Sequence, residues 1–224
     1  MHAMILAAGR GERMRPLTDH CPKPLLPVGG RPLSGYTLDR LATAGYREVV
    51  INLAHLGEQI RATLGERQSG LAIRYSPEPT GALETAGGIR QALPLLGEEP
   101  FLVVNGDVWC DHPLTPPATM NTAADRPLAH LVLVANPDHH TQGDFALDGE
   151  RVALEGNELL TFSGIGWYDP ALFRDLPPGR RALGPLLRQA IEAGRVTGEH
   201  YTGAWRDIGT PERLAALDTE LEGR

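Results

Sequence analysis

The chain begins with a short apolar run that leads directly into a segment rich in glycine and arginine. Residues 4–8 (MILAA) have the length and composition of a buried strand, and residues 9–16 (GRGERMRP) follow at once. Glycines let the backbone turn tightly and bring N–H groups close to an anion. Arginines donate charge-assisted hydrogen bonds to phosphate oxygens. This stretch therefore predicts a phosphate cradle at the end of the first strand, suited to a nucleoside triphosphate.

A single lysine follows the cradle. Lys23 stands between two prolines, and it is the only lysine among the 21 lysines and arginines of the chain. An ammonium group is a compact charge on a flexible stem, so it cannot be replaced freely by a planar guanidinium. We interpret Lys23 as a phosphate-binding residue, and the alternative is an accident of an arginine-rich composition.

The charge of the chain excludes broad nucleic-acid binding. The formal net charge is −7, whereas a nucleic-acid surface needs a basic face. Positive charge gathers locally, at Arg10, Arg13, Arg15 and Lys23. Such a cluster fits a small polyanionic ligand.

The cysteines and the apolar segments predict a cytoplasmic protein. Cys21 and Cys110 lie far apart without metal-type spacing, which is typical of a reduced compartment. The sequence contains neither a secretory leader pattern nor an apolar run long enough to cross a bilayer. We therefore expect no membrane association.

Apolar runs alternate with helical patterns through the first half of the chain. Strands are expected over residues 48–53, 71–75 and 101–104, and helices over 32–44, 56–64 and 85–93, with Thr85 as a cap of the last. This alternation predicts an α/β fold with a Rossmann-like, mixed but mainly parallel sheet flanked by helices. Ligands of such sheets lie at the carboxyl ends of the strands, where Gly9, Asn105 and Asp107 fall.

The second half of the chain has a different pattern. Strands are expected over residues 128–134, 145–147, 152–154, 160–168 and 196–201, and helices near 170–174, over 183–193 and from 211. A hexapeptide repeat typical of a β-helix appendage is missing from the sequence. We expect one domain, residues 1–224, with a nucleotide-binding part over about 1–110 and a sugar-binding part over about 111–224.

Two aspartates follow strands and are candidates for metal binding. Mg²⁺ is usually held by one or two carboxylates together with substrate phosphates, which Asp107 and Asp207 could provide. The alternative is that each aspartate closes a turn or caps a helix. His139 and His140 lack the spacing of a zinc site. Ser163 lies outside a Gly-x-Ser-x-Gly motif, so a sugar-contacting hydroxyl or a strand kink is expected there.

These motifs resemble the signature of the sugar-1-phosphate nucleotidyltransferases. The matching segments are residues 6–18 (LAAGRGERMRPLT), 22–25 (PKPL), 83–88 (LETAGG), 105–107 (NGD) and 205–210 (WRDIGT). Relatives often have glycine where Glu84 stands. The resemblance implies the nucleotide-diphospho-sugar transferase fold, and an in-line attack by a sugar 1-phosphate on the α-phosphorus of a nucleoside triphosphate.

The resemblance also implies roles for individual residues. Lys23, Arg13 and Asp107 would be catalytic, with Mg²⁺ as the cofactor held by Asp107 and Asp207. Gly11, Glu12, Arg13 and Lys23 would bind the triphosphate, and Glu78, Glu84 and Thr85 would lie near the base and ribose. Asn105, Asp144, Glu155 and Ser163 would meet the sugar phosphate; a solvated turn is the alternative for Glu155.

Further segments resemble one branch of this family, the bacterial N-acetylmuramate 1-phosphate uridylyltransferases of peptidoglycan recycling. They are residues 105–109 (NGDVW), 136–140 (NPDHH), 143–145 (GDF), 161–165 (TFSGI) and 198–201 (GEHY). The branch implies UTP as the nucleotide. The alternatives are a mannose- or glucose-1-phosphate nucleotidyltransferase using GTP or dTTP, and a non-catalytic sugar-nucleotide sensor. We expect a monomer or a small homo-oligomer.

Overall fold

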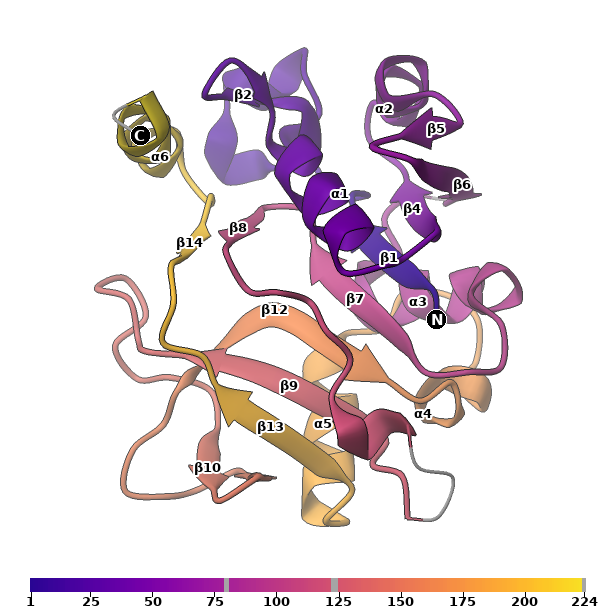
Figure 1. The fold of residues 1–224 in the computed structure, drawn as a ribbon, viewed down its shortest axis with the longest axis vertical. Coiled ribbons are helices and arrows are strands. Elements are labelled where there is room, and N and C mark those ends of the chain that lie inside the picture. The colour runs from indigo at the N-terminus through magenta and orange to yellow at the C-terminus, as the bar shows by residue number, and fades with distance from the viewer. Residues whose placement is uncertain (79–80, 122–124, 223–224) are drawn as a thin grey trace.

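A ten-stranded sheet runs through the protein, and both halves of the chain contribute strands to it (Figure 1). The computed structural model describes residues 1–78, 81–121 and 125–222. The strands stand in the order β10-β11-β13-β9-β12-β7-β1-β4-β6-β5. Their bounds are β1 (Ala3–Leu6), β4 (Glu48–Leu53), β5 (Arg67–Gln68), β6 (Leu71–Pro77), β7 (Phe101–Asn105), β9 (Ala129–Val134), β10 (Ala146–Asp148), β11 (Arg151–Ala153), β12 (Thr161–Tyr168) and β13 (Val196–His200).

The strand pairing confirms the mixed α/β sheet expected from the sequence. β7, β1, β4 and β6 pair in parallel, so their carboxyl ends meet at one edge. The second half is joined through β12, which runs antiparallel to both β7 and β9. β13 then returns parallel to β9. The sheet therefore places Leu6, Asn105 and the segments that follow them side by side.

Helices cover both faces of the sheet. Their bounds are α1 (Leu33–Thr43), α2 (Gly57–Leu64), α3 (Glu84–Leu96), α4 (Ala171–Arg174), α5 (Leu183–Glu192) and α6 (Pro211–Glu222). On one face, Leu38 of α1 and Ile60 of α2 share a buried cluster with Ile51 of β4. On the other face, Ile89 of α3 and Leu187 of α5 pack with Leu131 of β9. Burial of these apolar surfaces is the main stabilising contribution to the fold.

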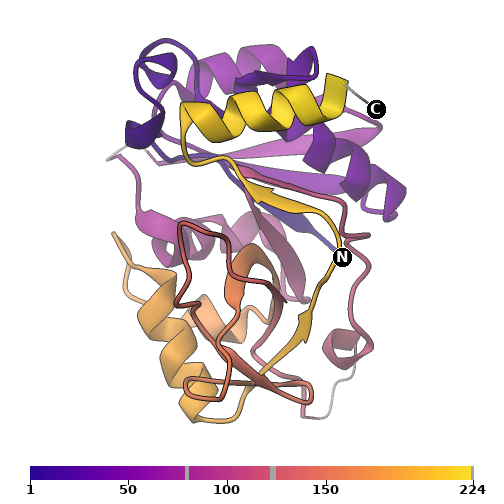
Figure 2. The same cartoon turned by 90° about the vertical axis from the view of Figure 1, so that its left-hand side faces the viewer.

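The C-terminal helix packs back against the N-terminal third of the chain (Figure 2). Leu214 and Leu217 of α6 join a third buried cluster with Met14, and the backbone N–H of Gly29 donates to Asp218 Oδ1 at 2.6 Å. Two small two-stranded sheets accompany this contact. They pair β2 (Pro27–Val28) with β3 (Arg31–Pro32), and β8 (Val108–Cys110) with β14 (Trp205–Asp207). The second pair carries the late aspartate to the segment that follows β7.

Most sequence-predicted elements are found within a residue or two of their expected bounds, and one helix start is a correction. The helix α3 begins at Glu84 with Leu83 as its N-cap, so Thr85 lies inside the first turn and does not cap the helix. The hairpin at residues 146–153 and the proline-started helix α6 are confirmed. Within the part of the chain that the structure describes, no helix combines the length and apolarity that a membrane span requires.

Candidate active site

The phosphate cradle lies between β1 and a short 3-10 turn, η1 (Glu12–Met14). Gly11 has φ +63°, in the left-handed region that favours glycine, and a Cβ there would lie 2.8 Å from Thr18 Cγ2. The Thr18 hydroxyl donates to Gly11 O at 2.8 Å, and the Met14 N–H donates to the same oxygen at 2.8 Å. Buried Met14 anchors the turn. The loop is therefore shaped by its own packing, with Glu12 and Arg13 left at the surface.

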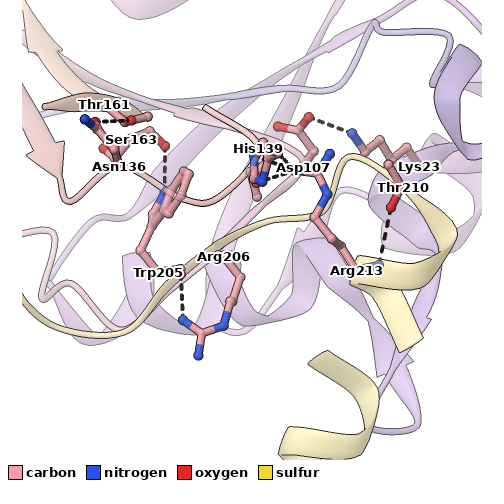
Figure 3. Close-up of polar contacts among 11 residues, drawn as sticks. Lys23, Asp107, Asn136, His139, Thr161, Ser163, Trp205, Arg206, Thr210 and Arg213 are labelled. Atoms are coloured by element: carbon pink, nitrogen blue, oxygen red, sulfur yellow. Dashed lines mark hydrogen bonds and ion pairs between the residues drawn. The ribbon is translucent and has the colours of Figure 1, made fainter. Parts of the chain in front are cut away.

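Lys23 and Asp107 meet at the floor of the site (Figure 3). Lys23 Nζ donates to Asp107 Oδ2 at 2.6 Å, and the Lys23 side chain is only 12% exposed. Asp107 is positioned by Gly106, whose N–H donates to Leu6 O at 2.9 Å. A side chain at Gly106 would collide with that carbonyl oxygen. The end of β7 is thus locked to the end of β1, directly beside the cradle.

These elements enclose a cavity of about 360 Å³, called here the first cavity. It brings together all seven residues that the resemblance assigns to the nucleotide, and Asn105 and Asp107 with them. Its lining includes Gly11, Glu12, Arg13, Lys23, Glu78, Glu84, Thr85, Asn105 and Asp107. Arg13 makes no hydrogen bond or ion pair with any residue that the structure describes, so its donors are free for a ligand.

Glu78 is buried at the back of the first cavity in a network that the sequence analysis missed. It accepts from Asn52 Nδ2 and from the Leu83 N–H, each at 2.7 Å. Asn52 Oδ1 in turn accepts from the Ala7 N–H at 2.7 Å. Burial raises the pKa of Glu78, and these two hydrogen bonds oppose that rise. The signal for Asn52 was present, because it is the one polar side chain between Val49 and Leu53 in a buried strand.

The start of α3 explains the glycines of the LETAGG segment. A Cβ on Gly88 would lie 2.6 Å from Glu78 Oε1, and a Cβ on Gly87 would collide with the carbonyl oxygen of Gly179. Glu84 has φ +60°, a conformation that costs a residue with a side chain about 1–2 kcal/mol. Its carboxylate pairs with Arg180 at 3.0 Å. The backbone at Glu84 therefore has a conformation to which glycine is better suited than glutamate.

A second cavity, of about 470 Å³, adjoins the first and shares Glu84, Thr85 and Asn105 with it. Asp144 lines it, as expected for a sugar-binding residue. Asp144 Oδ2 accepts from the Phe162 N–H at 2.8 Å, and Asp144 Oδ1 lies 3.1 Å from His140 Nε2. Arg188, from α5, also lines this cavity and was not predicted from the sequence.

Two expected sugar-binding residues lie outside both cavities. Glu155 is exposed on a bend after β11, as the solvated-turn alternative predicts. Ser163 is 1% exposed, and its hydroxyl oxygen accepts from the Ile165 N–H at 3.2 Å. The register of β12 against β9 shifts between Phe162 and Gly166, so Ser163 sits in a strand irregularity. Of the two interpretations of Ser163, the strand kink is the one that the structure shows.

The backbone that follows Asp207 contacts the Asp107 segment, whereas the Asp207 carboxylate is bound by residues outside the first cavity. The Ile208 N–H donates to Asp107 O at 2.7 Å, which joins the two aspartate segments. Arg213 Nη1 contacts both oxygens of Asp207, at 2.6 and 2.5 Å, and His139 Nε2 lies 3.0 Å from Oδ1. Asp207 lines a separate pocket with these two partners. The sequence predicts neither contact, because only the fold brings His139 and Arg213 to Asp207.

The donor set fits Mg²⁺ in part. Among the described residues, no group of three or more histidine, cysteine, aspartate or glutamate side chains is arranged to hold a metal. Mg²⁺ commonly takes one or two carboxylates and completes its shell with phosphate oxygens and water. Asp107 faces the first cavity and suits this role. Asp207 would first have to exchange its contact with Arg213.

Comparison with known proteins agrees with this geometry. The family model described as Nucleotidyl transferase matches residues 2–147. The N-acetylmuramate alpha-1-phosphate uridylyltransferase of Neisseria meningitidis is 54% identical over 96% of this chain and 95% of its own. That of Caulobacter vibrioides is 36% identical over 98% of this chain and 96% of its own. A Bacillus anthracis protein assigned as a glucose-1-phosphate thymidylyltransferase has the same fold, with a TM-score of 0.84, 22% identity and coverage of 100% and 96%.

The chain therefore belongs to the nucleotidyl transferase family. The resemblance to sugar-1-phosphate nucleotidyltransferases, and to their N-acetylmuramate branch, is confirmed.

Proposed function

We propose that this protein transfers the uridylyl group of UTP to N-acetylmuramate α-1-phosphate. The observation that carries the proposal is the 54% identity to the Neisseria uridylyltransferase along nearly the whole of both chains. The two adjoining cavities support it, because one carries the residues expected for a nucleotide and the other carries Asp144 beside apolar side chains. The product would be UDP-N-acetylmuramate, formed in the cytoplasm during peptidoglycan recycling.

The reaction needs little proton chemistry. An oxygen of the sugar phosphate attacks the α-phosphorus of UTP in line, a new P–O bond forms, and the bond to the β-phosphate breaks. Pyrophosphate leaves with the electron pair. Because the attacking oxygen is already anionic, no general base is required. Catalysis then depends on positioning the two phosphates and stabilising the charge that spreads over their oxygens.

The lining of the first cavity suits these two tasks. The backbone at Gly11, with Glu12 and Arg13, would hold the triphosphate, and Lys23 would bridge the reacting phosphates. Glu78, Glu84 and Thr85 would lie toward the base and ribose, and Asn105 and Asp144 toward the sugar phosphate. Asp107, with Asp207 after exchange of Arg213, would hold Mg²⁺. When bound, the ion would supply positive charge against the phosphate oxygens.

A substrate panel tests the proposal. UTP, GTP, dTTP and CTP are each paired with the 1-phosphates of N-acetylmuramate, N-acetylglucosamine, glucose and mannose, and pyrophosphate release is measured with and without Mg²⁺. We expect the highest kcat/KM for UTP with N-acetylmuramate 1-phosphate, and loss of turnover without Mg²⁺. A preference for mannose or glucose 1-phosphate with GTP or dTTP would contradict the proposal. Nucleotide binding without turnover on any pair would show a sensor.

A further inference from the structure

One arginine in the second cavity has no protein partner for its charge. Arg188 is the one basic side chain among the described residues that line this cavity. Its guanidinium carbon lies over the ring of Phe145, 5.9 Å from the ring centroid. It makes no hydrogen bond or ion pair with any residue that the structure describes. This cation–π contact places the guanidinium beside the cavity and leaves its N–H donors available.

The acidic groups of the second cavity cannot explain Arg188, because each already has a partner. Glu84 pairs with Arg180 at 3.0 Å. Both oxygens of Asp144 are engaged, one by the Phe162 N–H and the other by His140. Arg188 is exposed to solvent, and no acidic side chain of the cavity takes its N–H donors, so they can bind an anionic group of the ligand.

The position of Arg188 indicates which anionic group this is. Lys23 and Asp107 line only the first cavity, and Arg188 lines only the second. Asn105 lies between them, because it lines both. A sugar phosphate whose phosphate points toward Lys23 would thus present the far side of its sugar ring to Arg188.

The chemistry of the proposed substrate supplies an anion on that side. N-acetylmuramate is N-acetylglucosamine with a lactyl ether on O3, which adds one methyl group and one carboxylate. Around Arg188 the cavity has apolar lining from Leu183, Leu187 and Phe162, which suits the methyl group. A guanidinium presents paired donors that match a carboxylate.

Resting on the proposed function, we propose that Arg188 binds the lactyl carboxylate and selects N-acetylmuramate 1-phosphate over N-acetylglucosamine 1-phosphate. Arg188 is a specificity residue in this assignment, remote from the phosphate that reacts. A lost charge-assisted hydrogen bond lowers kcat/KM for the acidic sugar about 10- to 100-fold. The sugar of N-acetylglucosamine 1-phosphate, called here the neutral sugar, has no lactyl carboxylate. Loss of Arg188 should therefore reduce the preference for N-acetylmuramate 1-phosphate, the acidic sugar, over the neutral one.

The test compares Arg188→Met with the wild type and with Arg67→Met, an exposed arginine on β5 outside both cavities. For each protein, kcat/KM is measured with UTP and N-acetylmuramate 1-phosphate. The inhibition constant of N-acetylglucosamine 1-phosphate is measured in the same assay. Circular dichroism and the thermal midpoint check folding. Arg188→Lys, which keeps the charge without the planar fork, is expected to fall between Arg188→Met and the wild type.

We expect Arg188→Met to lower kcat/KM for the acidic sugar about 10- to 100-fold while the inhibition constant of the neutral sugar changes much less. Equal weakening of both would assign Arg188 to the shared phosphate and overturn the inference. An unchanged kcat/KM for the acidic sugar would overturn it too. If the wild type itself fails to use N-acetylmuramate 1-phosphate, the proposed function fails, which is a separate result from an effect confined to the variant.

Discussion

Lys23 Nζ and Asp107 Oδ2 lie 2.6 Å apart, although 84 residues separate them in the chain. The pair is mostly enclosed, with side-chain exposures of 12% for Lys23 and 32% for Asp107. Its position at the carboxyl ends of β1 and β7 follows from the locking of Gly106 to Leu6. The ion pair places a cation and a carboxylate next to each other in the lining of the first cavity, where Lys23 could bind a phosphate and Asp107 a metal ion.

Lys23 variants test this arrangement. We expect Lys23→Ala and Lys23→Arg to lower kcat by about 10²-fold or more, because lost electrostatic stabilisation of transferring phosphates has this magnitude. The arginine variant keeps the charge, but its planar fork does not fit a space built for a compact ammonium. Pyrophosphate release measures kcat, and the thermal midpoint checks that each variant folds. Full activity of Lys23→Arg would show that the single lysine is an accident of composition.

Local sequence was enough to predict what depends on neighbouring residues. The tight turn at Gly11, the strand β4 and the proline-started helix α6 all follow from short-range patterns. The two-residue strands β2 and β5 could not be predicted, because two residues carry no periodicity. Thr85 was misplaced as a cap because the helix begins one residue earlier, at a residue with positive φ.

The polar contacts of the site were harder to predict than its location. Ser163 was expected to be either a sugar-contacting hydroxyl or part of a strand kink, and the structure places it in the core at the bulge in β12. The partners of Asp207 come from a loop and from α6, 68 residues earlier and 6 residues later in the chain. Such distances depend on how whole elements pack, which a motif does not encode. The same reason left Arg188 unpredicted, whereas Asn52 was visible as the one polar side chain between Val49 and Leu53 but was not assigned a role.

Asn52 gives a prediction about stability. Replacing it by leucine removes the partner of the Ala7 N–H and one partner of Glu78. A buried polar group left without a partner costs about 1–3 kcal/mol, so the free energy of unfolding should fall by at least that amount. Urea unfolding measures the change. Asn157→Leu, at an exposed position, is the matched control; equal stability of the two variants would mean that the network contributes nothing.

His130 gives a prediction about pH. It is 6% exposed, its Nδ1 lies 3.0 Å from Thr197 Oγ1, and its Nε2 has no hydrogen-bond partner. Burial lowers its pKa from 6.5, although the carboxylates of Glu199 and Glu150 act in the opposite direction. Between pH 6.5 and the lower pKa of His130 in the folded protein, this histidine is therefore protonated in the unfolded chain but neutral in the folded protein.

Over that interval the free energy of unfolding should decrease on acidification, with a limiting slope of about 1.4 kcal/mol per pH unit. His130→Gln should flatten the slope, whatever its effect on the absolute stability. Urea unfolding at a series of pH values from 8 to 5 measures this. The exposed His20 supplies the control variant His20→Gln, which should keep the wild-type slope. An equally steep slope in His130→Gln would assign the pH dependence to another group.

Gly164 links the bulge in β12 to the first cavity. It has φ +79°, and a Cβ there would lie 2.5 Å from Asn105 Nδ2. Gly164→Ala should therefore displace the Asn105 side chain, which lines both cavities, and weaken sugar phosphate binding.

Gly149→Ala is the matched control, because Gly149 also has positive φ, +59°, but a Cβ there meets no atom within 4 Å. Both variants carry similar backbone strain, of about 1 kcal/mol. We expect a KM for the sugar phosphate that rises at least about tenfold only in Gly164→Ala, which is the effect of losing one good hydrogen bond. The thermal midpoint of Gly164→Ala should also lie below that of Gly149→Ala, because only at Gly164 would the added Cβ meet another side chain. Parallel changes in KM for the two variants would show that Asn105 does not contact the substrate.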